Sequence, residues 1–229
     1  MYDPVPPDGH LAPGLALVFD MDGVLVDSNP VHREAWVAFN RRYGVETSEA
    51  MLERMYGKRN DQIVRDYFGD SLPPEEVARR GRAKEELYRE MMAGRVEEIL
   101  VPGLRQFLDR YGGSPLAVAS NAEPENVALV LDKARLRPYF QAVVDGHQVS
   151  HPKPHPEVFL TAAALLHTPA ANCIVFEDSH AGIAAAKAAG MRVIGVHTTH
   201  ENLPDTDLTI DNFISGNLTS WLGAQLRAI

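Results

Sequence analysis

The sequence predicts an α/β fold, a doubly wound parallel sheet into which an all-helical segment is inserted. From Val101 onward, short apolar segments of strand length are interleaved with helical segments, and one more such apolar segment lies at 15–19. Between them, residues 30–94 show helical patterns and no strand pattern. Continuous apolar strands between helices are typical of a parallel sheet that is covered on both faces.

These patterns divide the chain into domains. A core domain is expected to combine residues 15–29 with 95–229, and residues 30–94 are expected to form a helical domain inserted after the first strand. Residues 1–14 contain four prolines and no apolar run, which is typical of a disordered N-terminal tail and not of a signal peptide. A chain of 229 residues is long enough for two domains and a sizeable core.

The helices of the insert follow from the spacing of apolar residues. Val31, Ala35 and Phe39 recur on one stripe of the first helix, and glycine- and proline-containing segments separate the next ones. The last helix is dense in Arg, Lys and Glu and is expected to be largely solvated. The expected helices cover 30–43, 49–55, 61–68 and 74–92.

The expected core elements follow from apolar runs and from the amphipathic segments between them. After the strand at 15–19, further strands are expected at 115–120, 142–145, 173–176, 192–197 and 207–210. Helices are expected at 103–111, 125–136, 156–167, 180–189 and 217–227.

The composition narrows the class of protein. With 45% hydrophobic and 23% charged residues and a net charge of −9, the chain is ordinary for a globular protein, and it has no dense Lys/Arg cluster that would favour nucleic acid or an anionic membrane. Its one cysteine, Cys173, excludes an intramolecular disulfide and fits a reducing compartment. No apolar run approaches the ~18 residues of a membrane-spanning helix. A cytoplasmic protein, monomeric or weakly dimeric, is expected.

Two carboxylates mark the end of the first strand. Asp20 follows it directly, Asp22 comes two residues later, and Gly23 lets the chain turn away. Because side chains alternate along an extended segment, the two carboxylates should point the same way. Such a pair suggests a hard-metal site with one oxygen free to attack a substrate. The alternative is a plain hairpin turn, in which Asp-Gly is common.

Polar residues follow the other strands as well. In open α/β sheets, ligands bind at the carboxyl ends of the strands, and this chain places polar groups at several of them. Each has a simpler explanation, as an ordinary turn, a helix N-cap or an exposed lysine, but these do not explain why they occur together. The residues are Ser120, Asn121, Lys153, Glu177 and Asp178.

Four ordered motifs give the chain a family resemblance. They are Phe-Asp20-Met-Asp22-Gly-Val-Leu-Val-Asp27-Ser28, Ala-Val-Ala-Ser120-Asn121, Lys153-Pro-His-Pro-Glu-Val-Phe, and Phe-Glu177-Asp178-Ser-His-Ala-Gly182 with the helix that follows. Over residues 15–229 the chain resembles the haloacid dehalogenase (HAD) superfamily of phosphotransferases, which implies a Rossmann-like core. The helical insert resembles the C1-type cap of the β-phosphoglucomutase and phosphoglycolate phosphatase branch.

The resemblance implies roles for the acidic residues. Asp20 would attack phosphorus and form an aspartyl-phosphate. Mg²⁺ would be held by Asp20, by the backbone carbonyl of Asp22 and by Asp178, with Glu177 supporting the metal site. The Asp22 side chain would protonate the leaving oxygen and then activate water. True dehalogenases characteristically lack this acid and the metal, so Asp22 favours phosphoryl transfer.

The remaining roles concern the phosphoryl group and the rest of the substrate. Ser120 and Asn121 would bind phosphoryl oxygens, and Lys153 would neutralise charge on the nucleophile and the phosphoryl group. Four further residues of the insert stand in mutase-like positions and would bind substrate: His32, Trp36, Gly57 and Lys84. The alternatives are a packing pair for His32 and Trp36 and a solvated lysine for Lys84.

Two departures from the mutase pattern favour a phosphatase of small phosphorylated metabolites, such as sugar or polyol phosphates. Glu123 stands where the mutase pattern has a phosphate-binding lysine, and Arg59 is displaced by one residue from the position of a distal phosphate-binding arginine. A carboxylate repels a second phosphate. A β-phosphoglucomutase-like isomerase remains the alternative, and a non-catalytic metabolite-sensing protein on the same fold is a remote one.

Three histidines are spaced by four residues, at His147, His151 and His155. On a helix this spacing would suggest a metal-binding face. Pro152 and Pro154 exclude such a helix, so the spacing is expected to be coincidental.

Overall fold

The computed structural model describes residue 11 and residues 14–56 and 58–225. Its centre is a parallel six-stranded sheet with the strand order β3-β2-β1-β4-β5-β6, which confirms the predicted fold class. The strands are β1 Ala16–Phe19, β2 Leu116–Ala119, β3 Ala142–Val144, β4 Cys173–Glu177, β5 Arg192–Val196 and β6 Leu208–Ile210. Every neighbouring pair is parallel.

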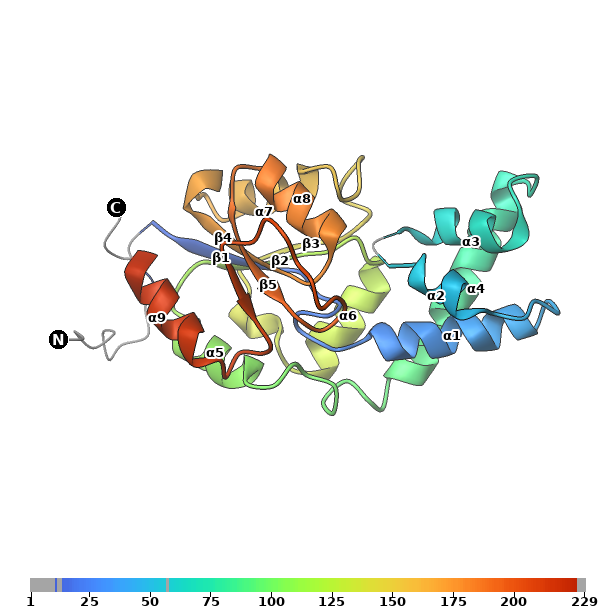
Figure 1. Cartoon of the computed structure of the whole chain (residues 1–229), viewed down its shortest axis with the longest axis horizontal. Helices are drawn as coiled ribbons and strands as arrows, with labels where there is room; N and C mark the ends of the chain where they lie inside the picture. Colours follow the sequence, from blue (N-terminus) through green and yellow to red (C-terminus); the bar gives the residue numbers. More distant parts are fainter. Residues whose placement is uncertain (1–10, 12–13, 57, 226–229) are drawn as a thin grey trace.

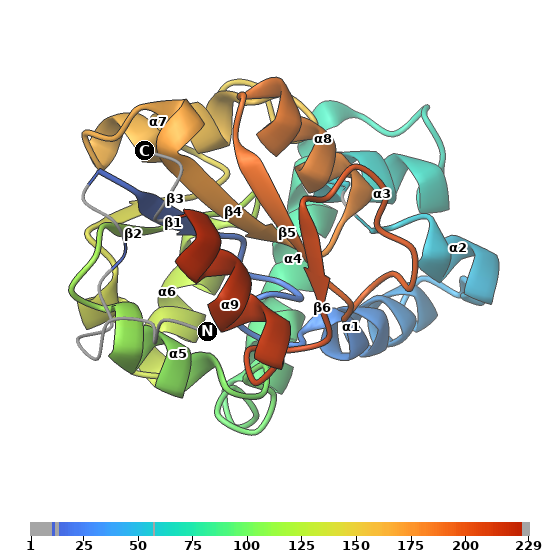
Figure 2. The same cartoon turned by 60° about the vertical axis from the view of Figure 1, so that its left-hand side comes forward.

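Helices cover both faces of this sheet, as Figure 2 shows. Side chains of β1 alternate between two apolar clusters: Leu17 and Phe19 face one side, and Ala16 and Val18 face the other. The first side is covered by α5 Leu104–Tyr111, α6 Pro124–Lys133 and α9 Gly216–Gln225, and the second by α7 Glu157–Leu165 and α8 His180–Ala188. Phe19 stacks on Phe176 of the neighbouring strand with ring centroids 4.7 Å apart, which fixes the register at the centre.

The remaining four helices are grouped at one end of the molecule (Figure 1). They are α1 Asn29–Arg41, α2 Glu49–Glu53, α3 Asn60–Phe68 and α4 Pro74–Met92, here called the helical region. They share an apolar cluster built around Trp36, Phe39 and Val64. Among the described residues of this segment none belongs to a strand, as predicted. Its division from the core as a separate domain stays a prediction.

The structure differs from the sequence prediction at a few points. Helix α4 was expected to be largely solvated, but one side of it is buried and includes the charged pair Lys84 and Glu85. In the predicted N-terminal tail, Leu11 is buried and its backbone N–H donates to Ser114 Oγ at 3.0 Å; most of that tail lies outside the described residues. Two short 3₁₀ helices, Arg137–Tyr139 and Ala170–Asn172, were not predicted. Within the described part of the chain, no helix combines the length and apolarity needed to cross a membrane.

Candidate active site

A cavity of about 440 Å³ lies between the carboxyl ends of the strands and the helical region. All the predicted site residues that the structure describes line it: Asp20, Asp22, His32, Trp36, Lys84, Ser120, Asn121, Lys153, Glu177 and Asp178. Gly57, the remaining predicted residue, lies outside the described part of the chain. Residues from distant parts of the sequence therefore meet at the edge of the sheet where α/β proteins bind ligands.

Asp20 is buried at the end of β1 and paired with Lys153. Asp20 Oδ1 lies 2.5 Å from Lys153 Nζ, and the same ammonium lies 2.7 Å from Glu177 Oε1. Burial raises the pKa of Asp20 to about 7; the charge of Lys153 opposes this rise, and Glu177 and Asp22 add to it. Burial lowers the pKa of Lys153, but the two carboxylates outweigh burial and raise it, so the ammonium stays charged.

Asp178 follows β4 and reaches toward the turn after Asp22. Its Oδ2 accepts hydrogen bonds from Thr199 Oγ1 and, at 3.5 Å, from Asn29 Nδ2. A Cβ at Gly23 would lie 1.9 Å from this oxygen, and the backbone there has φ +77°, so the turn requires glycine. Burial, and then the charges of Glu177 and Asp20, raise the pKa of Asp178 well above its usual value.

Glu177 holds the surrounding groups in place. Its Oε1 accepts from Lys153, and its Oε2 accepts from the backbone N–H of Asp178 and from the backbone N–H and hydroxyl of Ser179, each at 2.9 Å. A Cβ at Gly182 would lie 1.7 Å from Oε1, so the start of α8 needs a glycine to admit this carboxylate. Both oxygens of Glu177 are engaged, which suits a supporting role better than direct ligation of a metal.

The donor set fits a hard divalent cation. Three carboxylates, of Asp20, Glu177 and Asp178, are buried around the ammonium of Lys153. Burial, and then the neighbouring carboxylates, raise the pKa values of Asp20 and Asp178, so that a bound cation would stabilise their ionised forms. Hydrogen bonds from the described residues leave Asp20 Oδ2 and Asp178 Oδ1 free. Carboxylate oxygens are the ligands that Mg²⁺ prefers.

Asp22 is held by residues at the start of the helical region. Ser28 Oγ donates to Asp22 Oδ1 at 2.5 Å, and His32 Nε2 lies 3.6 Å from the same oxygen. Lys84 Nζ lies 3.1 Å from His32 Nδ1; because an ammonium only donates, Nδ1 accepts, and the ring proton is left on Nε2, facing Asp22. The His32 ring stacks on Tyr88 at 3.8 Å. Burial raises the pKa of Asp22, but the contacts with His32 and Ser28 outweigh it and hold the pKa below its usual value.

Lys84 and Trp36 are both buried, which decides whether Lys84 is a solvated lysine and whether Trp36 is a packing residue. Lys84 is 1% exposed, so it is not a solvated lysine. Trp36 is also 1% exposed and packs edge-on against Tyr67 with centroids 5.2 Å apart, while lining the cavity. It is therefore a packing residue of the helical region and a wall of the cavity at once.

Sequence reasoning missed Glu85, a buried carboxylate that also lines the cavity. Its Oε1 accepts from Lys84 Nζ at 2.6 Å and from Asn60 Nδ2 at 2.7 Å, and its Oε2 accepts from Asn126 Nδ2 at 2.5 Å. Burial raises its pKa, but the charge of Lys84 and the hydrogen bonds from Lys84 and Asn126 outweigh burial and lower the pKa to about 2. Asn126 belongs to α6, so Glu85 joins the helical region to the core. The only sequence signal for it was its place next to Lys84.

Ser120 and Asn121 lie beside Lys153 at the end of β2. Ser120 is buried, and its Oγ accepts from the backbone N–H of Ala122 at 3.1 Å. Asn121 Oδ1 accepts from the backbone N–H of Lys153 at 3.2 Å, so this side chain helps to place the Lys153 loop. Both predicted residues reach the cavity next to Asp20.

Comparison with known proteins agrees with this site. A family model described as haloacid dehalogenase-like hydrolase matches residues 15–190. The chain is 35% identical over 184 residues to the fructose-1-phosphate phosphatase YqaB of Escherichia coli, covering 79% of this chain and 95% of that protein. It is 30% identical over 190 residues to the β-phosphoglucomutase of Bacillus subtilis, covering 79% and 82% of the two chains.

A solved structure shows the same likeness over nearly the whole chain. A crystal structure of β-phosphoglucomutase from Clostridium difficile has a TM-score of 0.82 to this structure, with 25% sequence identity, and the match covers 93% of this chain and 99% of that one. The four motifs, the parallel sheet and the relatives agree, which confirms the resemblance that the sequence indicated. The chain belongs to the haloacid dehalogenase-like hydrolase family.

Proposed function

We propose that this protein is a Mg²⁺-dependent phosphatase that hydrolyses small phosphorylated metabolites, such as sugar or polyol phosphates, through an aspartyl-phosphate on Asp20. The observation that carries the proposal is the pairing of buried Asp20 with Lys153 beside Asp178, in one cavity with Asp22. Relatives named as a fructose-1-phosphate phosphatase and a phosphorylated carbohydrates phosphatase support the substrate class.

In the first half-reaction, Asp20 attacks the phosphorus atom of the ester. The bond from phosphorus to the leaving oxygen breaks, and that oxygen takes a proton from the carboxyl group of Asp22, which is ionised in the free enzyme and takes up this proton when the anionic substrate binds beside it. Lys153 offsets the negative charge shared by Asp20 and the phosphoryl oxygens, to which Ser120 and Asn121 also donate. The products of this step are a free alcohol and phosphorylated Asp20.

In the second half-reaction, Asp22 acts as the base. Its carboxylate takes a proton from a water molecule, the water oxygen attacks the phosphorus atom, and the bond to Asp20 breaks to release inorganic phosphate. His32 and Ser28 keep Asp22 in place through both steps. Asp20 returns to its starting carboxylate.

Mg²⁺ would be held by Asp20, Asp178 and the backbone carbonyl of Asp22, with Glu177 fixing the surrounding loop. When bound, it supplies positive charge that stabilises the transferring phosphoryl group. Asp178 contributes one of the few anionic ligands. Its position against Gly23 brings its oxygen close to the turn that follows Asp20.

Replacing Asp178 with alanine should change the Mg²⁺ dependence of the enzyme. With one anionic ligand gone, we expect activity at low Mg²⁺ to fall at least about tenfold and to recover in part at high Mg²⁺. Phosphate release measured over a Mg²⁺ series tests this. Asp145→Asn is a matched control, because Asp145 is a buried carboxylate at the same edge of the sheet that instead accepts from the His147 backbone. An Asp178→Ala enzyme with the Mg²⁺ dependence of the wild type would exclude Asp178 as a ligand.

The far side of the cavity favours a phosphatase over a mutase. A mutase must hold a second phosphate there, and the charge of the buried carboxylate of Glu85 on that wall is balanced by Lys84 at 2.6 Å. Glu123 also lines the cavity and its Oε2 lies 2.7 Å from His147 Nε2. Basic residues line the cavity as well: Lys58, which is paired with Asp66 at 2.6 Å, and also Arg59 and Arg82. The preference for a phosphatase therefore rests on Glu123, a carboxylate that stands where the mutase pattern has a phosphate-binding lysine.

We expect β-glucose 1-phosphate, if it is accepted, to yield mainly glucose and inorganic phosphate, even with a bisphosphate activator. A weakly held distal phosphate leaves phosphorylated Asp20 open to water. One assay that measures free phosphate and glucose 6-phosphate together decides between the activities. Glucose 6-phosphate that accumulates many times faster than phosphate would establish the mutase and refute the phosphatase.

The proposal also covers the compartment, the oligomeric state and the type of ligand. We propose that it acts in the cytoplasm as a monomer or weak dimer, on small molecules and not on nucleic acid, in keeping with its net charge of −9 and single cysteine. Hydrolysis of p-nitrophenyl phosphate and acetyl phosphate with and without Mg²⁺ separates an enzyme from a metabolite-sensing protein. A screen of phosphorylated metabolites then identifies the substrate.

A further inference from the structure

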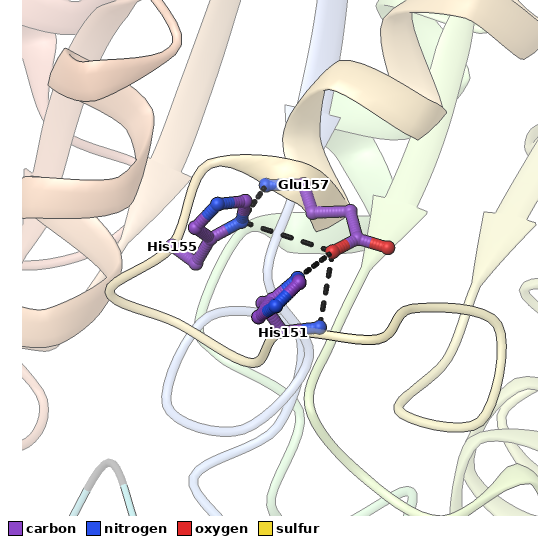
Figure 3. A group of neighbouring side chains, drawn as sticks. All are labelled: His151, His155 and Glu157. Carbon is purple, nitrogen blue, oxygen red and sulfur yellow. Dashed lines mark hydrogen bonds and ion pairs between the residues drawn. The ribbon is translucent and has the colours of Figure 1, made fainter.

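His151 and His155, in the loop between β3 and α7, form a cluster with Glu157, the first residue of α7 (Figure 3). The sequence correctly predicted that the histidines do not share a helix face, because both lie in a loop. The side chains of His151 and His155 nevertheless lie together, because the loop itself brings their rings to 4.6 Å. One ring nitrogen of each and one Glu157 oxygen lie within 4.8 Å of one another.

Glu157 is the fixed member of the cluster. Its Oε1 accepts from the backbone N–H of Ser150 at 2.8 Å, and its Oε2 accepts from the backbone N–H of His151 at 3.0 Å. Glu157 Oε2 also lies 2.8 Å from His151 Nδ1 and 3.8 Å from His155 Nδ1. The two imidazole rings are 4.6 Å apart at a tilt of 38°. The backbone N–H of Glu157 donates to His155 Nδ1 at 3.3 Å. The two imidazoles thus lie around one carboxylate oxygen whose position the backbone sets.

We propose that His151, His155 and Glu157 bind a transition-metal ion of the Zn²⁺, Co²⁺ or Ni²⁺ class. Imidazole nitrogens with one carboxylate are ligands that these ions favour, whereas Mg²⁺ prefers oxygen ligands alone. Bonds of about 2.0–2.1 Å to such an ion bring tetrahedral ligand atoms to roughly 3.3 Å from one another. The histidine side chains are 66% and 51% exposed, which leaves room for this small closing movement, and His155 Nδ1 would exchange the backbone N–H of Glu157 for the ion. The remaining coordination positions would hold water.

The histidine cluster is separate from the carboxylate cluster at Asp20, but the same loop carries residues of both. Lys153, whose ammonium pairs with Asp20, lies between the two histidines in sequence, flanked by Pro152 and Pro154. The prolines restrict the backbone, so the ligands lose little conformational freedom on binding. An ion bound to both histidines would join the loop on either side of Lys153.

Titration of the untagged, full-length protein with Co²⁺ in excess Mg²⁺ tests the proposal. Mg²⁺ occupies oxygen-ligand sites, and the visible absorption of Co²⁺ reports imidazole ligation. We expect one equivalent to bind with a nitrogen-ligand spectrum, and His151→Ala or His155→Ala to weaken binding at least about tenfold. Zn²⁺ should displace the Co²⁺ signal. Because both side chains are exposed, the variants should keep the thermal unfolding curve of the wild type.

His147→Ala is the matched control. His147 is 57% exposed and lies 2.7 Å from Glu123, so it is a histidine–carboxylate pair close in the chain to the cluster but outside it. Its replacement should leave Co²⁺ affinity unchanged. Binding that survives His155→Ala, or that falls as much in His147→Ala, would be scattered binding to surface histidines and would overturn the proposal. So would binding that excess Mg²⁺ abolishes, because it would place the ion at the carboxylates.

Discussion

Replacement of Asp20 with asparagine is expected to reduce turnover at least about a thousandfold. The amide keeps the shape of the side chain and can still accept from Lys153, but it removes the anionic oxygen that attacks phosphorus. The fold should survive, because the change removes a negative charge that burial and the neighbouring Glu177 and Asp22 disfavour. Steady-state phosphate release from p-nitrophenyl phosphate measures the loss.

A control variant and thermal unfolding distinguish the loss of the nucleophile from a loss of folded protein. Asp145→Asn makes the same chemical change in a buried carboxylate at the same edge of the sheet and should retain activity. Thermal unfolding curves of both variants show whether they are folded. Mg²⁺-dependent turnover of folded Asp20→Asn within about tenfold of the wild type would remove Asp20 as the nucleophile.

The sheet was predictable because its strands are short, continuous apolar runs. Such runs, when helices alternate with them, are typical of strands covered on both faces, and β1, β2 and β4 begin and end within a residue or two of their predicted bounds. The meeting of Asp20, Ser120 and Glu177 followed from the same logic, since the carboxyl ends of parallel strands share one edge.

Contacts between the helical region and the core were not predictable in this way. Glu85 lies in a helix whose many charges suggest exposure, and nothing local marks it as buried. Its burial depends on Asn60 from α3 and Asn126 from α6, which donate to it from distant parts of the chain. The periodicity of a single sequence predicts individual helices and strands, but it does not predict which side chains of other elements will contact them.

The contacts within the histidine cluster were also not predictable from the sequence. Pro152 and Pro154 correctly excluded a helix in this segment. A loop has no regular periodicity, however, so the spacing of its residues does not predict which side chains come into contact. What brings His151 and His155 together is the hydrogen bonding of Glu157 to the loop backbone, a tertiary detail.

Asp22→Asn is expected to separate the two half-reactions. The amide oxygen can still accept from Ser28, so the geometry is kept, but the side chain can neither give nor take a proton. Turnover of a sugar phosphate should fall about 10²–10⁴-fold, because its leaving alcohol needs a proton. The nitrophenolate of p-nitrophenyl phosphate leaves without one, so phosphorylation of Asp20 should be much less affected with this substrate.

Hydrolysis of the phosphorylated enzyme still needs a base for water, and Asp22→Asn has lost it. Rapid mixing with p-nitrophenyl phosphate should therefore give a burst of nitrophenol equal to the enzyme concentration, followed by slow turnover. Asp20→Asn, which cannot be phosphorylated, should give no burst. If Asp22→Asn slows both substrates equally and shows no burst, then Asp22 does not act as the acid and base, and the hydrogen bonds from Ser28 and the contact with His32 serve only to hold the turn.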